Sequence, residues 1–220
     1  KDDGGTADGG VDTSAPQSFQ IAVTPVNDAP TLGAITDQNI PEDAVPQSVV
    51  LSGISAGPSN ESQVVSLTAV SDNPALIPNP TIAYTSPDGT AVLNFAPVAD
   101  ANGTANITVT VTDNGGTAND GVNTTVQTFR VNVAPVNDAP RFTKGNDQTA
   151  QEDAGPQTIS HWATAISAGP PDESGQSLSF QVNNNNPTLF IVQPAISADG
   201  TLTYTSAPDA SGSADVTAQL

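Results

Sequence analysis

The sequence contains a long repeat whose two copies are in phase, and this repeat restricts the possible folds more than any other feature. The hexapeptide Pro-Val-Asn-Asp-Ala-Pro that begins at Pro25 returns unchanged at Pro135, 110 residues further along the chain. The triplet Glu-Asp-Ala that begins at Glu42 returns at Glu152 with the same spacing. A period of this length indicates a tandem array of similar domains, in which each unit contacts mainly its neighbours.

The repeat is out of frame with the ends of this sequence. In the first copy, Val111 is followed by a Gly-rich turn and a last alternating stretch, whereas the second copy reaches Leu220 without either. Matching residues occur instead in the first 24 positions, where Phe19, Ile21 and Val23 alternate with polar residues. We therefore expect a final strand of a preceding repeat, a complete repeat, and a second repeat that lacks its last strand, over residues 1–24, 25–134 and 135–220 respectively.

Apolar and polar residues alternate within each unit with a period of two, which is the pattern of half-buried strands. Ile107, Val109 and Val111 alternate with threonines, and turn signals such as Asn102–Gly103 separate such runs. Aromatic residues make up only 4% of the chain, so Val, Ile, Leu and Ala must build the core. The sequence predicts an all-β fold of tandem immunoglobulin-like antiparallel β-sandwiches in an elongated array.

The charge of the chain excludes several partners. There are 23 acidic residues against four Lys and Arg, which leaves a formal net charge of −19. Binding to nucleic acid or to an anionic membrane needs clustered basic residues, so neither partner is expected. No stretch is apolar enough for membrane insertion. Repulsion among so many negative charges destabilises a compact fold, and a bound divalent cation would reduce it. The alternative is that the charge serves only to keep the protein soluble.

Catalysis is not expected from these residues. The chain has no Cys, which removes thiolate nucleophiles and thiolate metal sites. His161 is the sole His, and the adjacent Ser160 would point to the opposite face of a strand. A Ser-His-Asp arrangement is therefore not supported, and we expect a protein that is not an enzyme.

The chain resembles the cadherin-like and immunoglobulin-like tandem repeats of large bacterial surface proteins of the adhesin type. The residues that carry the resemblance are the linkers beginning at Pro25 and Pro135, the Glu-Asp-Ala triplets, and the stretch 113–142. The resemblance implies an extracellular or cell-surface location, with Ca²⁺ bound between domains. The ligands it implies are Asn27, Asp28 and Asp113 at one junction, then Asn137, Asp138 and Glu42 at the next, joined by Asp2 or Asp3 from a following segment.

Two alternatives for the linkers remain open at the level of sequence. Carboxylate and amide oxygens are suitable Ca²⁺ ligands, because this ion takes six to eight oxygens. Alternatively, the Asn-Asp pairs only cap a tight turn through side-chain hydrogen bonds, and the flanking prolines stiffen the linker without metal.

The sequence favours a structural function. We expect a subunit or repeat of a rod-like extracellular filament or cell-surface stalk, with Ca²⁺ as the candidate stiffener, that supports adhesion or a matrix. Its partners would be copies of itself, placed head to tail in a covalent array or a strand-donating filament. The alternative function is an adhesive module that recognises a glycan or surface receptor through the well-matched loops 54–61 and 166–173.

Overall fold

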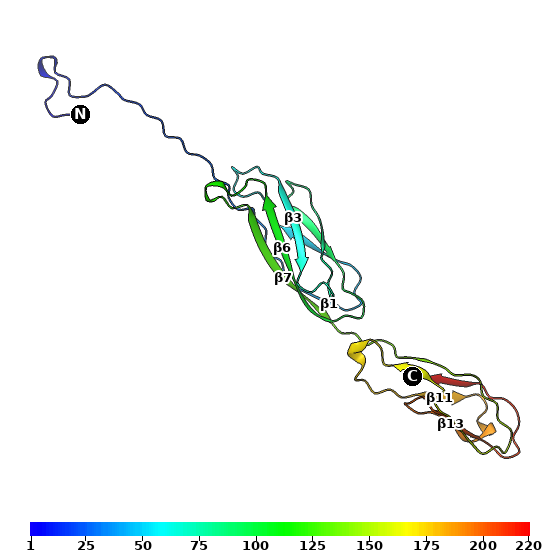
Figure 1. Ribbon diagram of the computed structural model, residues 1–220. Helices are drawn as coiled ribbons and strands as arrows, with labels where there is room; N and C mark the ends of the chain where they lie inside the picture. Colours follow the sequence, from blue (N-terminus) through cyan, green and yellow to red (C-terminus); the bar gives the residue numbers. More distant parts are fainter.

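Two β-sandwich domains lie end to end, and an extended N-terminal segment projects from the first of them (Figure 1). This is a computed structural model that describes residues 1–220. The helical content is four single 3₁₀ turns, η1 (Ala7–Gly9), η2 (Ala118–Asp120), η3 (Pro171–Glu173) and η4 (Pro187–Leu189). None of these helices is long and apolar enough to cross a membrane.

The first domain is an immunoglobulin-like sandwich. Its strands are β1 (Gln38–Pro41), β2 (Gln47–Ser52), β3 (Val65–Ser71), β4 (Thr81–Ala83), β5 (Thr90–Phe95), β6 (Gly103–Asp113) and β7 (Thr124–Ala134). One sheet has the order β1-β7-β6-β3, in which only β1 pairs in parallel, and the other has the order β2-β5-β4. Apart from the parallel pair β1-β7, both sheets are antiparallel, and the two enclose one core between them as in immunoglobulin-like sandwiches, so the predicted fold class is confirmed.

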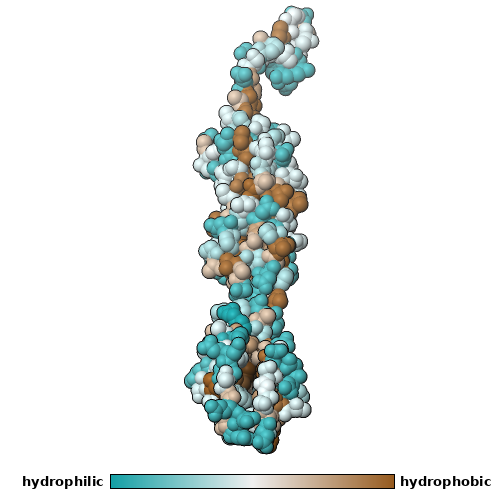
Figure 2. All heavy atoms as spheres, turned by 90° about the vertical axis from the view of Figure 1, so that its right-hand side faces the viewer, coloured by the Kyte–Doolittle hydropathy of each residue, from teal (hydrophilic) through white to brown (hydrophobic).

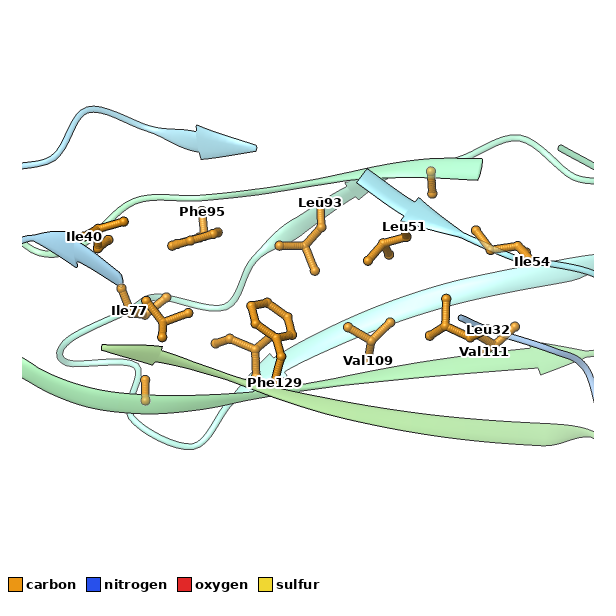
Figure 3. Close-up of a cluster of buried hydrophobic side chains, with 14 of the residues drawn as sticks. Leu32, Ile40, Leu51, Ile54, Ile77, Leu93, Phe95, Val109, Val111 and Phe129 are labelled. Carbon is orange, nitrogen blue, oxygen red and sulfur yellow. The ribbon is translucent and has the colours of Figure 1, made fainter. Parts of the chain in front are cut away.

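The alternation of apolar residues along the strands builds the core between the two sheets (Figure 3). On β6, Ile107, Val109 and Val111 are fully buried, while the threonines between them face outward. Phe129 of β7 packs opposite Leu93 of β5, near the centre of a cluster of 17 buried residues. Burial of each large apolar side chain stabilises the fold by about 1.5–3 kcal/mol.

The second domain repeats this plan incompletely. Its strands are β8 (Arg141–Thr143), β9 (Pro156–Ile159), β10 (Thr164–Ser167), β11 (Gln181–Asn184), β12 (Phe190–Ile196), β13 (Leu202–Ser206) and β14 (Val216–Gln219). They form sheets of order β12-β13-β9, β10-β8 and β11-β14, and no counterpart of β7 covers the outer edge of β14.

The open edge leaves the second core shallow. Only three residues are buried in its cluster, Ala163, Ile196 and Leu202, compared with 17 in the first domain. In Figure 2 the second domain, at the bottom of the view, has a hollow between its two halves, whereas the first domain presents a closed surface.

Candidate metal centre

Acidic side chains from four segments of the chain gather where the first domain joins the second. Asp43 follows β1, Asp100 lies between β5 and β6, and Asp138 lies in the linker after β7. Carboxylate oxygens of these three residues lie within 4.8 Å of one another. Glu42 of the first domain and Glu173 of the second lie close enough for their charges to act on Asp138.

The fold itself places Glu42 at this junction. Because β1 runs parallel to β7, the residue that follows β1 lies beside the linker that follows β7. The backbone N–H of Glu42 donates to the carbonyl of Ala134 at 3.0 Å. Its carboxylate is 0% exposed and accepts hydrogen bonds from the Val136 backbone N–H at 2.6 Å and the Asn102 side-chain amide at 3.2 Å.

Glu173 reaches the linker from the second domain. It ends η3, is 4% exposed, and its Oε1 accepts a hydrogen bond from the backbone N–H of Asp138 at 2.5 Å. Its Oε2 is buried and has no hydrogen-bond partner. A Cβ added at Gly169, where φ is +158°, would lie 1.6 Å from this Oε2. Only glycine therefore lets the loop close over the carboxylate.

Asp138 lies among the other four carboxylates of the cluster. Its Oδ2 is buried and has no partner. Desolvation raises the pKa of Asp138 above its usual range, and the negative charges of Asp43, Asp100, Glu173 and Glu42 raise it further. Neither ion pair of the chain contributes a cation here, since both involve other aspartates.

The donor set fits a hard divalent cation such as Ca²⁺. Every candidate ligand in the cluster is an oxygen, which is the atom that Ca²⁺ takes in preference to nitrogen or sulfur. Two buried carboxylate oxygens, Glu173 Oε2 and Asp138 Oδ2, have no protein partner. An unpartnered buried carboxylate oxygen is costly, and a bound cation removes that cost.

At the first linker the structure brings together two of the three predicted ligands. The Asn27 side-chain amide donates to Asp113 Oδ1 at 3.0 Å and to the Val122 carbonyl at 2.7 Å. Asp28 is not part of this pair, and its backbone N–H donates instead to Glu61 Oε1 at 3.3 Å. Asn27 Oδ1 and Asp113 Oδ2 are both buried without a partner. The first linker thus has side-chain hydrogen bonds, as expected of a capped turn. It also has two buried oxygens without a partner, as expected of a cation site.

At the second linker the structure brings Glu42 and Asp138 to the same cluster. Asn137 takes part in local hydrogen bonds, donating to the Asp138 carbonyl at 3.0 Å and accepting from the Gln176 amide at 3.0 Å. Asp2 and Asp3 lie far away in the N-terminal segment (Figure 1), where Asp2 Oδ1 accepts a hydrogen bond from the Gly4 N–H at 3.0 Å. Within one chain they do not reach this junction.

Sequence reasoning missed Asp43, Asp100 and Glu173 as candidate ligands. The signal that would have found them is the repeat, because acids recur in phase at Asp153, Asp209 and Glu61. The turn at Asp100, where φ is +58°, even recurs at Asp209, where φ is +55°. An aspartate with positive φ therefore occurs at the corresponding turn of both copies, so the two turns share the same backbone conformation.

Comparison with known proteins gives structural likenesses of low identity. No protein-family model matches the sequence, and no curated protein matches it. Drosophila N-cadherin EC1-4 is similar at 18% identity, with 87% of this chain and 45% of that chain covered and a TM-score of 0.48. The human Desmocollin-1 ectodomain matches at 15% identity, covering 86% and 37%, with a TM-score of 0.46. The titin domains Z1Z2 in complex with telethonin match at 15%, covering 90% and 91%, with a TM-score of 0.38. The fold assignment therefore rests on the strand order and core described above.

Proposed function

We propose that this chain is a rod-like structural element of an extracellular filament or cell-surface stalk that supports adhesion or a matrix. In this rod, Ca²⁺ at the domain junction holds successive sandwiches end to end. Glu42, Asp43, Asp100, Asp138 and Glu173 would hold the ion. The units follow one another head to tail, in a covalent array or by donation of a strand between subunits. The observation that carries the proposal is the acidic cluster, whose members come from both domains and the linker.

An ion at this position would stiffen the joint because its ligands belong to separate bodies. Glu42, Asp43 and Asp100 come from the first domain, Glu173 comes from the second, and Asp138 lies between them. Bending the joint would pull ligands away from the ion. Without a cation, the negative charges of the cluster repel one another, and this repulsion favours an open, flexible joint, more so at low salt.

The same contacts account for the loops that suggested a receptor-binding role. Loop 54–61 holds the linker before the first domain, through the hydrogen bond from Asp28 N–H to Glu61. Loop 166–173 holds the next linker through the hydrogen bond from Asp138 N–H to Glu173. The similarity of the two loops follows from this shared contact, so we place the structural role ahead of glycan or receptor recognition.

Small-angle X-ray scattering in EDTA and in Ca²⁺ tests the proposal. We expect Ca²⁺ to increase the largest interatomic distance, as a hinged pair of domains becomes a straight rod. Asp100→Asn combined with Asp138→Asn should abolish this response, because both changes remove charge from the cluster. The matched control is Asp147→Asn, which removes an exposed acid elsewhere in the second domain. A scattering profile of the unmodified chain that is identical in EDTA and Ca²⁺ would overturn the proposal.

A further inference from the structure

A hollow of about 440 Å³ lies at the end of the first domain that contacts the first linker. Its walls come from loop 54–63 and from residues between β4 and β5, and its size is within the range of about 300–1,000 Å³ that small-molecule sites occupy. None of the five carboxylates of the junction cluster lines it. The residues that matter most for its chemistry are Pro58, Ser59, Glu61, Gln63, Tyr84 and Pro87.

The lining of this hollow combines apolar rings with polar groups. Tyr84, Pro58 and Pro87 contribute rings, whereas Glu61 and Gln63 contribute a carboxylate and an amide. A sugar unit has the same division, because the C–H face of its ring is apolar and hydroxyl groups surround it. Tyrosine joins an apolar ring to a hydroxyl group, so one side chain can contact both parts of such a ligand.

Two polar atoms of the lining residues lack a hydrogen-bond partner. Tyr84 Oη and Gln63 Oε1 are both buried, and neither makes a hydrogen bond within the chain. A buried polar atom without a partner costs free energy. A ligand hydroxyl can accept from the phenol and donate to the amide oxygen, so a ligand rich in hydroxyl groups supplies what both atoms lack.

The charge of the lining disfavours ionic ligands. Glu61 is its only charged residue, so an anionic ligand would find no Lys or Arg as a counter-charge. The Glu61 carboxylate already accepts hydrogen bonds from the Asp28 backbone N–H at 3.3 Å and from the Gln63 side-chain amide. It is thus engaged within the chain, and the lining fits a neutral ligand better than a cationic one.

The second copy of the repeat keeps the loop but not the aromatic ring. When the copies are aligned on their Asp-Gly-Thr triplets, Tyr84 corresponds to Ala195. Glu61, by contrast, recurs as Glu173, which makes the same contact to the next linker. The linker contact therefore belongs to the repeat, whereas the tyrosine is a feature of the first domain that the shared fold does not require.

We propose that this hollow binds a neutral saccharide unit, a further function that does not depend on a cation at the domain junction. The Tyr84 ring packs against the C–H face of the sugar. Sugar hydroxyl groups pair with Tyr84 Oη and Gln63 Oε1, the two atoms that have no partner in the chain alone.

Saturation-transfer difference NMR on the full chain tests the site. The neutral probes are the methyl glycosides of glucose, galactose, mannose, N-acetylglucosamine and xylose. Glucuronate is the anionic probe, and N-acetyl-lysine amide, which represents a basic peptide, is the cationic probe. We expect magnetisation transfer to at least one neutral glycoside and to neither charged probe. Transfer to none of the neutral glycosides overturns the proposal, as does transfer to a charged probe alone.

Tyr84→Phe separates binding from folding. The variant keeps the ring and loses only a buried hydroxyl without a partner, so its stability in urea unfolding followed by circular dichroism should not fall. Its affinity for the saccharide should fall by about threefold to tenfold, the effect of one hydrogen bond. Tyr204→Phe is the matched control, since it makes the same change in the second domain, outside the hollow. An unchanged affinity in Tyr84→Phe, or an equal loss in Tyr204→Phe, overturns the site.

Asp100→Asn combined with Asp138→Asn keeps the two proposals distinguishable. This double variant should lose the scattering response to Ca²⁺ and bind the saccharide as the unmodified chain does, because neither residue lines the hollow. Loss of saccharide binding in the double variant would overturn the independence of the site from the junction.

Discussion

Replacing Glu173 by Gln should raise the stability of the second domain without Ca²⁺ and reduce the additional stability that Ca²⁺ provides. In EDTA, the substitution removes one of the negative charges that raise the pKa of Asp138, so the repulsion within the cluster decreases. The free energy of unfolding of the second domain should therefore rise in EDTA.

In Ca²⁺, the same substitution removes a ligand. At a free Ca²⁺ concentration of about 100 times the dissociation constant, the unmodified chain gains about 2.7 kcal/mol from binding. A tenfold weaker affinity in the variant would reduce this gain to about 1.4 kcal/mol. The increment caused by Ca²⁺ should therefore fall by about half.

Urea unfolding followed by tryptophan fluorescence measures both quantities. Trp162 is the only Trp, belongs to the second domain, and donates its indole N–H to the carbonyl of Asn146 at 2.8 Å, so its emission reports on this domain. Glu61→Gln is the matched control, because Glu61 accepts the same kind of hydrogen bond from the first linker and lies outside the acidic cluster at the domain junction. The reasoning is refuted if Glu173→Gln keeps the full Ca²⁺ increment, or if it destabilises the second domain in EDTA.

Three further changes have defined outcomes. Phe129→Ala should lower the free energy of unfolding of the first domain by about 3–5 kcal/mol, measured by urea unfolding with circular dichroism, because it empties the centre of the core. Gly169→Ala should weaken Ca²⁺ binding measured by calorimetry, since the added Cβ displaces the Glu173 carboxylate. Ser197→Ala should raise the pKa of Asp199 towards its usual value in an NMR titration, because the Ser197 hydroxyl is the main group that lowers this pKa. A lowered pKa contributes stability that is present above the ordinary aspartate pKa and is lost as pH falls through the lowered value, so the variant should lose that contribution.

Each of these predictions has a control in the chain. Val126→Ala on β7 changes a residue that is 55% exposed, and a loss as large as that of Phe129→Ala would contradict the core argument. Gly175→Ala meets no atom within 4 Å, so equal losses of Ca²⁺ affinity in Gly169→Ala and Gly175→Ala would contradict the closure of the loop over Glu173. An unchanged pKa of Asp199 in Ser197→Ala would show that the hydrogen bonds from Thr201 suffice.

The fold class could be predicted from sequence because period-two alternation is a local signal. Ile107 and Val109, for example, alternate with threonines, and this alternation alone predicts that their side chains face the core. The resemblance placed Asn27, Asp28 and Asp113 at one junction as Ca²⁺ ligands, and in the structure the Asn27 amide contacts Asp113. By contrast, Asp100 and Glu173 belong to different domains and lie in one cluster only in the folded protein. No local sequence pattern predicts that they are close in space. The recurrence of such acids at matching positions of the other copy is the one sequence signal that could have identified them.

The parallel pairing of β1 with β7 has a consequence for a molecule under tension. The chain enters the first domain near the bridge between Thr31 and Ser55 and leaves at Ala134, where β7 ends. A pull on the two linkers draws β1 and β7 along their own length in opposite directions, so the hydrogen bonds between them are loaded in shear and must fail together. Strands pulled apart from one end would instead lose their bonds one at a time, at lower force. The strand that closes the first sandwich is thus also the one that resists its extension.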